Sequence, residues 1–168
     1  NLADGASGSG GGIFSTAGDV TVSNSMVSAN VANRAGGGIE LIQGSLILTD
    51  VTLGGATRFD ANIAGPAGSA APGNGGGLHV SGVASITIRG GEVVGNIAAR
   101  EGGGLWNQSG ATMTLTNSTM VANNVASGPS PDDGGGGIFN NGGALIVESA
   151  RITNNMADGA SGSGGGLF

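Results

Sequence analysis

Short runs in which apolar and polar positions alternate recur along the whole chain and predict its regular elements. The first run is Val20-Thr21-Val22, in which two β-branched apolar residues flank a polar one. Alternation with a period of two is typical of a strand that buries one face. Four related runs follow, Leu46-Ile47-Leu48, Ile86-Thr87-Ile88, Met113-Thr114-Leu115 and Leu145-Ile146-Val147. No stretch shows sustained helical periodicity, so we predict an all-β fold.

Two further motifs accompany each run and set a repeat of about thirty residues. Three glycines and an aliphatic residue precede the run, first as Gly10-Gly11-Gly12-Ile13. An apolar residue, two variable residues, Asn, an apolar residue and Ala follow it, first as Val27-Ser28-Ala29-Asn30-Val31-Ala32. Self-similarity with this period indicates a solenoid.

Three short strands per repeat predict a single chain wound into a parallel β-helix of about five coils, with no caps. The coils start near Asn1, Asn30, Asn62, Asn96, Asn124 and Asn155, and residues 1–168 form one segment. Stacked strands lie roughly 4.8 Å apart, so like positions lie above one another. Inward Asn side chains can then form a hydrogen-bonded ladder. We predict a structural Asn ladder of Asn30, Asn62, Asn96, Asn124 and Asn155, with Asn123 as an alternative in the fourth copy.

The residue after each glycine–aliphatic motif is predicted to point outward. These residues are Phe14, Glu40, His79, Trp106, Phe139 and Phe168. Four of the six are aromatic, in a chain with only four Phe, one Trp and no Tyr. Because a line of exposed aromatic rings usually marks a contact surface, Phe14, Trp106, Phe139 and Phe168 form a candidate lateral contact column. The alternative is that a loop or a neighbouring turn covers the rings.

Differences in coil length concentrate in the loop between Asn-apolar-Ala and the next glycine triplet. The longest of these loops is Gly65 to Asn74. Insertions at one corner of a solenoid project from one face, which is often the interaction face. Asp132 and Asp133 form the densest acidic pair on this candidate loop face. Adjacent loop aspartates are usually solvated, and calcium binding is the alternative.

Composition argues against several functional classes. The chain has five basic residues against eleven acidic ones, so no basic stripe is available for nucleic acid. No apolar run reaches the ~20 residues that a membrane helix needs, and we expect no membrane insertion. The chain has no cysteine. The carboxylates Asp19, Asp50, Glu92 and Glu148 fall on different coils without a common slot. We therefore expect no catalytic residues, no metal site, no cofactor and no enzyme activity.

The two ends of the sequence repeat each other. Asn1 to Phe14 and Asn155 to Phe168 agree at twelve of fourteen positions, and the two differences, Leu2/Met156 and Ile13/Leu167, are conservative. Ordinary coil periodicity does not require the loop sequence to recur as well. We interpret the offset of 154 as a tandem super-repeat of a longer protein, with non-covalent stacking of separate chains as the alternative.

The glycine–aliphatic motif, together with Phe59-Asp60-Ala61-Asn62, resembles the polymorphic outer-membrane protein repeat, whose signatures are GGA plus an aliphatic residue and FxxN. Here the third small residue is Gly, and Phe is Val or Ile in the other full copies. The resemblance covers the whole chain. It implies a right-handed parallel β-helix of the kind found in bacterial surface adhesins and autotransporter passengers, and it carries no catalytic residues onto this chain.

These observations favour a structural, non-catalytic role. We expect an extracellular or cell-surface fibre, stalk or filament segment, whose main partner is the chain itself through end-to-end stacking and lateral bundling. The alternative is an adhesin or glycan-binding module that uses the aromatic column to hold a host protein or glycan. A polysaccharide lyase or hydrolase is the least favoured alternative.

Overall fold

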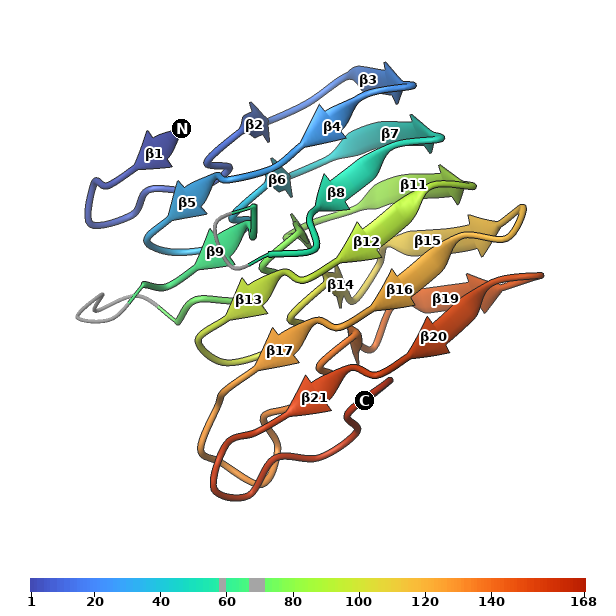
Figure 1. Ribbon diagram of the computed structural model, residues 1–168. Helices are drawn as coiled ribbons and strands as arrows, with labels where there is room; N and C mark the ends of the chain where they lie inside the picture. Colours follow the sequence, from blue (N-terminus) through green and yellow to red (C-terminus); the bar gives the residue numbers. More distant parts are fainter. Residues whose placement is uncertain (58–59, 67–71) are drawn as a thin grey trace.

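The computed structural model describes residues 1–57, 60–66 and 72–168, and every regular element in these residues is a β-strand (Figure 1). Phe59 of the FxxN motif and the middle of the loop from Gly65 to Asn74 lie outside the described residues. The fold is thus all-β, as the alternating runs predict.

The strands form four parallel sheets, and the chain visits them in a fixed order. The first sheet holds β1 (Leu2–Ala3), β5 (Val31–Ala32), β9 (Ile63–Ala64), β13 (Ile97–Ala98), β17 (Val125–Ala126) and β21 (Met156–Ala157). The second holds β2 (Ile13–Ser15), β6 (Ile39–Leu41), β10 (Leu78–Val80), β14 (Leu105–Gln108) and β18 (Ile138–Asn141). The third holds β3 (Asp19–Ser23), β7 (Gly44–Thr49), β11 (Ala84–Arg89), β15 (Thr112–Thr116) and β19 (Ala144–Val147). The fourth holds β4 (Met26–Val27), β8 (Thr52–Gly54), β12 (Glu92–Val94), β16 (Met120–Ala122) and β20 (Arg151–Thr153).

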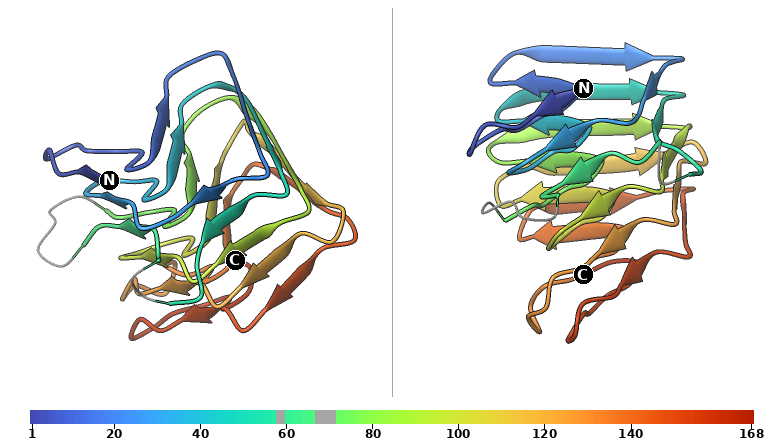
Figure 2. Two further views of the ribbon diagram at one scale, coloured as in Figure 1. Left: turned by 45° about the horizontal axis from the view of Figure 1, so that its top comes forward. Right: turned by 60° about the vertical axis from the view of Figure 1, so that its left-hand side comes forward.

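Each passage of the chain through the four sheets, here called a coil, lies on the previous one, as the two views of Figure 2 show. All pairings between strands of successive coils are parallel and in register, for example Ile39 with Leu78 and Leu78 with Leu105. This arrangement is consistent with a β-solenoid.

The number of strands per coil differs from the expected three, because the Asn motif contains two strands. In the first coil, β4 ends at Val27 and β5 begins at Val31. Ala29, which lies between these strands, has a φ of 54°. Asn123 and Asn154 directly precede ladder residues of later coils and have φ of 56° and 54° respectively. A left-handed residue turns the chain sharply, so the strand cannot continue through it. The motif therefore forms a corner between the fourth and first sheets.

Inward side chains of successive coils form continuous apolar columns. Leu46, Ile86 and Met113 follow one another in the third sheet and are at most 1% exposed. The residues that continue this column in the outermost coils, Val20 and Leu145, are only partly buried. The core is thus one apolar stack that is sealed in the middle coils and open toward both ends.

The glycine triplets are required by close packing between the second and first sheets. A Cβ on Gly103 would collide with the backbone of Gly136 and of Val125. Gly76 and Gly136 face equivalent backbone collisions in their own coils. Since a side chain at this place has no room, only glycine lets the two sheets approach so closely.

Candidate functional site: the Asn ladder and the aromatic column

The Asn side chains at the corner before the first sheet form a continuous hydrogen-bonded ladder. Asn1 Nδ2 donates to Asn30 Oδ1 at 2.7 Å, and Asn30 Nδ2 donates to Asn62 Oδ1 at 2.8 Å. The series continues with three bonds of 2.9 Å, from Asn62 to Asn96, from Asn96 to Asn124 and from Asn124 to Asn155. Asn124, and not its neighbour Asn123, occupies the slot in the fourth copy.

Each inner ladder amide also donates to the fourth-sheet strand of the preceding coil. Asn96 Nδ2 donates to Leu53 O and Asn124 Nδ2 donates to Val93 O, both at 2.9 Å. The Oδ1 atom of Asn124 additionally accepts from the Asn96 backbone N–H. The side chains of Asn62, Asn96 and Asn124 are fully buried, so these bonds satisfy polar groups that water cannot reach.

Three members of the predicted column, Trp106, Phe139 and Phe168, stack in one row with His79, whereas Phe14 pairs with Glu40 in the strand register. His79 pairs with Trp106 and Trp106 with Phe139 in the strand register. Their rings are stacked, with centroid distances of 4.3 Å for His79–Trp106, 6.1 Å for Trp106–Phe139 and 5.1 Å for Phe139–Phe168. The in-register strands thus bring four rings from four coils into one face-to-face row.

The prediction that this column is exposed is wrong for its inner members. Trp106 and Phe139 are each 6% exposed, whereas Phe14 and Phe168 at the ends are 53% and 40% exposed. His79 and Phe139 stack on the Trp106 ring, and Trp106 Nε1 donates to Glu101 Oε2 at 3.0 Å in the loop before the glycine triplet. The inner rings therefore hold successive coils together and are not available as a lateral contact surface.

A buried charged network continues the column and was not predicted from the sequence. Glu40 is fully buried, and its Oε1 accepts from Arg34 at 3.0 Å and from Ser81 Oγ at 2.7 Å. Its Oε2 lies 2.8 Å from His79 Nδ1. Three partners from two coils satisfy this carboxylate, as a buried charge requires. His79, which we expected at the surface, is 5% exposed.

Of the two aspartates on the candidate loop face, the structure buries one. Asp132 is exposed, whereas Asp133 is 1% exposed and pairs with Arg100 at 2.9 Å. Burial raises the pKa of Asp133, but the Ser130 backbone N–H and Arg100 outweigh it and hold the pKa below its ordinary value. Asp133 thus ties two adjacent loops together.

Glu101 lies in the same loop layer and shows the opposite shift. Burial raises its pKa, a Trp106 hydrogen bond opposes this, and the nearby Asp133 charge adds to the rise. Asn74 Nδ2 also donates to Glu101 at 2.9 Å, while Asn74 Oδ1 is buried without a hydrogen-bond partner.

In the described part of the chain, no group of three or more His, Cys, Asp or Glu side chains could hold a metal ion.

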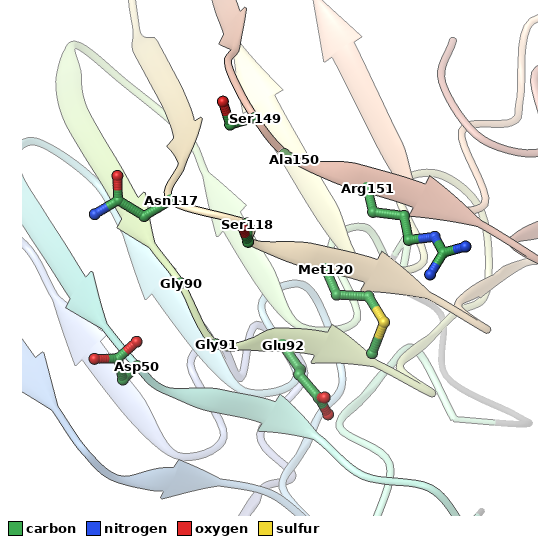
Figure 3. Close-up of a pocket in the computed structure, with 10 residues that line it drawn as sticks. All are labelled: Asp50, Gly90, Gly91, Glu92, Asn117, Ser118, Met120, Ser149, Ala150 and Arg151. Carbon is green, nitrogen blue, oxygen red and sulfur yellow. The ribbon is translucent and has the colours of Figure 1, made fainter.

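A groove at the corner between the third and fourth sheets collects some of the carboxylates that we expected to be scattered (Figure 3). Asp50, Glu92 and Arg151 line it, together with Asn117 and Met120. The sequence could not show this, because the three charged residues belong to different coils. Glu92 and Arg151 are both exposed on the wall of the groove.

The first sheet carries an outward aliphatic column that the sequence analysis did not single out. The apolar residue of each Asn-apolar-Ala motif points away from the core, while the Ala after it is buried in the four inner copies and partly buried in the two outermost ones. The column consists of Leu2, Val31, Ile63, Ile97, Val125 and Met156. The alternation of strand side chains makes this outward placement a direct consequence of the inward Asn and Ala.

Comparison of the chain with protein-family models, with curated proteins and with solved structures finds no match. Among the residues that the structure describes, no helix is long and apolar enough to span a membrane.

Proposed function

We propose that the chain is a segment of a non-catalytic extracellular or cell-surface fibre or stalk. In this proposal it is a right-handed parallel β-helix, and its coils continue from one 154-residue repeat into the next. The resemblance to the polymorphic outer-membrane protein repeat supports the handedness and the surface location. The observation that carries the proposal is the placement of the recurring segment at both ends of one stack.

The two copies of this segment occupy equivalent places. β1 and β21 are the two outermost strands of the first sheet, and they begin one residue after Asn1 and Asn155 respectively. Asn1 and Asn155 are also the two outermost members of the ladder. A stack whose last half-coil repeats its first has the form of one period of a longer array.

The apolar ends support the same conclusion. Leu167 and Val147 continue core columns whose inner members are almost fully buried, yet they are 48% and 42% exposed. Open strand edges over an exposed core favour further pairing. A further coil on this end would bury both side chains and would pair with the unpaired edges of β19 and β20.

The burial of Trp106 and Phe139 argues against the adhesin alternative, since it removes most of the surface that a glycan or host protein would contact. Glu92 and Arg151 in the corner groove belong to no hydrogen-bonded or ion-paired constellation among the described residues, so the groove gives no specific support to a lyase or hydrolase.

Electron microscopy of the purified chain tests the fibre. We expect filaments with an axial layer line near 4.8 Å, the spacing of hydrogen-bonded strands. Val147→Asp should abolish them, because it places a charge on the open end of the core. Val83→Asp is the matched control, since Val83 is 74% exposed on the side of the stack and should leave filaments unchanged. Discrete particles from the unmodified chain, or filaments that survive Val147→Asp, would refute the proposal.

A further inference from the structure

We infer that one side of the stack is a contact surface for a second copy of this chain, turned so that the two stacks run antiparallel. The centre of this surface is the outward column of the fourth sheet formed by Glu92, Met120 and Arg151, here called the charge-flanked column. The inference goes beyond the proposed fibre, because it concerns the side of the stack and does not require chains to join at their ends.

Three consecutive strands place this column in a fixed order. Glu92 pairs with Met120, and Met120 with Arg151, in the parallel register of β12, β16 and β20. Figure 3 shows the three side chains in one row along the corner groove. Since neighbouring strands lie about 4.8 Å apart, roughly 9.6 Å separates the backbone positions of the two charged residues, with the methionine midway. The column thus carries opposite charges at equal distances from an apolar centre.

Neither charge is used inside the chain. Among the residues that the structure describes, Glu92 and Arg151 take part in no ion pair and no side-chain hydrogen bond, and both are exposed. Met120 between them is only partly buried. All three side chains are therefore accessible to a partner.

A two-fold axis that runs along the strands and passes beside Met120 makes the column complementary to itself. Rotation about this axis reverses the order of the strands, so Glu92 of each copy faces Arg151 of the other, and the two Met120 side chains meet. Two identical ion pairs then flank an apolar contact. Contacts in which the same patch of both subunits is used are the commonest kind in homo-oligomers.

The same charges disfavour other arrangements. If two parallel stacks met through this column, Glu92 would face Glu92 and Arg151 would face Arg151, and like charges repel. A shift of the antiparallel arrangement by one strand would leave the charges without opposite partners. Asp50, which also lines the groove, lies one coil beyond Glu92 and so adds to the negative end. The column therefore specifies one orientation and one register.

The edge of the third sheet carries the same pattern with the signs exchanged. Arg89 pairs with Thr116 in the strand register, and Glu148 directly follows Val147, the partner of Leu115. These two charges therefore also lie one strand to either side of a neutral residue, next to the corner groove. The rotation turns Arg89 of each copy toward Glu148 of the other, so opposite charges approach at this edge as well.

The first sheet adds apolar contact in the same arrangement. β13, β17 and β21 directly follow β12, β16 and β20 along the chain, and Figure 1 shows them continuing the same side of the stack. Their outward residues Ile97, Val125 and Met156 pair in register. The rotation places Ile97 opposite Met156 of the second copy and Val125 opposite Val125, so apolar side chains lose contact with water on both copies.

Cysteine cross-linking tests the contact, since the chain has no cysteine of its own. Exposed ion pairs contribute little individually, so the pairing should be reversible, and a covalent bond traps it at high protein concentration. Met120→Cys places two thiols at the axis. We expect a disulfide-linked dimer to form at least about tenfold faster than with Val83→Cys, because a complex holds the two thiols at a high effective concentration. Val83 is exposed between β10 and β11, away from this surface.

Charge reversal in the Met120→Cys chain tests the ion pairs. Glu92→Arg sets like charges against each other and should slow the cross-link at least about tenfold, as 1.4 kcal/mol of lost attraction would. Adding Arg151→Glu restores opposite charges and should restore the rate. Recovery in this double variant also shows that the single variant is folded. A rate that does not respond to charge reversal, or that equals the rate of Val83→Cys, would overturn the inference.

Two further cysteine variants test the orientation. Chains with Glu92→Cys should cross-link to chains with Arg151→Cys and only slowly to one another, whereas rapid linkage of Glu92→Cys chains to one another would show parallel alignment and overturn the inference. Electron microscopy reads filament formation separately. Filaments without the Met120→Cys cross-link would overturn the pairing and leave the fibre intact, and cross-linked dimers without filaments would overturn the fibre and leave the pairing intact.

Discussion

The imidazole of His79 lies flat on the indole of Trp106, with ring centroids 4.3 Å apart and an angle of 21° between the planes. The two residues come from adjacent coils and are direct partners in the strand register. The rings thus couple the coil that holds the buried Glu40 network to the coils that hold the phenylalanines. Removal of the Trp106 ring should therefore weaken the packing of both His79 and Phe139.

Trp106→Ala should lower the free energy of unfolding by about 3–5 kcal/mol, because it opens a cavity in a buried stack. Trp106→Phe keeps a ring but loses the bond to Glu101, so its cost should be nearer to about 1 kcal/mol. Chemical denaturation monitored by circular dichroism measures both. Phe14→Ala is the control, since Phe14 is half exposed at the end of the column. Equal losses for Trp106→Ala and Phe14→Ala would contradict the buried column.

Asn96→Ala should be among the most damaging single substitutions in the ladder. It removes the donor to Leu53 O and to Asn124 Oδ1 and the acceptor for Asn62 Nδ2. Each buried polar group left unpaired costs about 1–3 kcal/mol, so we expect a loss of at least about 3 kcal/mol. Asn141→Ala, at an exposed position outside the ladder, should change stability by less than about 0.5 kcal/mol. If the two variants unfold at the same denaturant concentration, the ladder is not stabilising.

Glu40→Ala should destabilise the chain by about 3–5 kcal/mol, since it leaves Arg34 and Ser81 without their buried partner. Glu92→Gln, on the exposed wall of the corner groove, is the matched carboxylate control and should change the midpoint of thermal unfolding little. A Glu40→Ala variant as stable as the Glu92→Gln variant would show that the network contributes nothing.

Gly103→Ala should prevent correct folding or cost several kcal/mol, of the order that overpacking causes, because its Cβ meets backbone atoms of Gly136 and Val125 that cannot move aside. Gly5→Ala offers a control in the same chain, since its Cβ would have nothing within 4 Å. Soluble yield and thermal unfolding of the two variants measure the difference. Indistinguishable behaviour would argue against the close approach of the first and second sheets.

Glu101→Gln should raise stability at neutral pH and flatten its pH dependence. Because burial raises the pKa of Glu101, the folded state favours the neutral acid, and stability is lost as the pH rises through this raised pKa. Gln removes the charge, keeps an acceptor for Trp106 and brings an amide donor near the unpartnered Asn74 Oδ1. Thermal unfolding across the acidic to neutral range is the measurement, with Glu148→Gln as the exposed control. The opposite sign, a variant less stable at neutral pH than at acidic pH relative to the parent chain, would contradict the assignment.

The sequence was sufficient to predict the parts of the fold that repeat. The alternating run Ile86-Thr87-Ile88 lies inside β11, and the Asn positions lie at one corner of every coil. Both follow from local pattern, since side-chain alternation in a strand fixes which residues face the core. The corner inside the Asn motif was missed although Gly95, Asn123 and Asn154, which directly precede ladder residues, are of the types that readily adopt a left-handed φ; Ala29 at the same position carries no such signal.

The burial of the second-sheet column could not be read from the sequence. The glycine motif places Glu40 and His79 at like positions of successive coils, which are partners in the strand register, but it does not show that both are buried or that Arg34 and Ser81 also bind Glu40. Trp106 is buried between the rings of His79 and Phe139 and donates to Glu101. Exposure of a strand residue follows from alternation only when no other side chain covers that face.

Each of the five hydrogen bonds between ladder asparagines runs in the same direction, from the side-chain amide of one asparagine to the side-chain oxygen of the asparagine in the following coil. The row of side chains is therefore polar: along the stack, each asparagine presents its oxygen to the preceding coil and its nitrogen to the following coil. Any filament built by repeating this arrangement has distinguishable plus and minus ends. Its two ends should elongate at different rates. Parallel and antiparallel alignment of neighbouring filaments would be distinct arrangements.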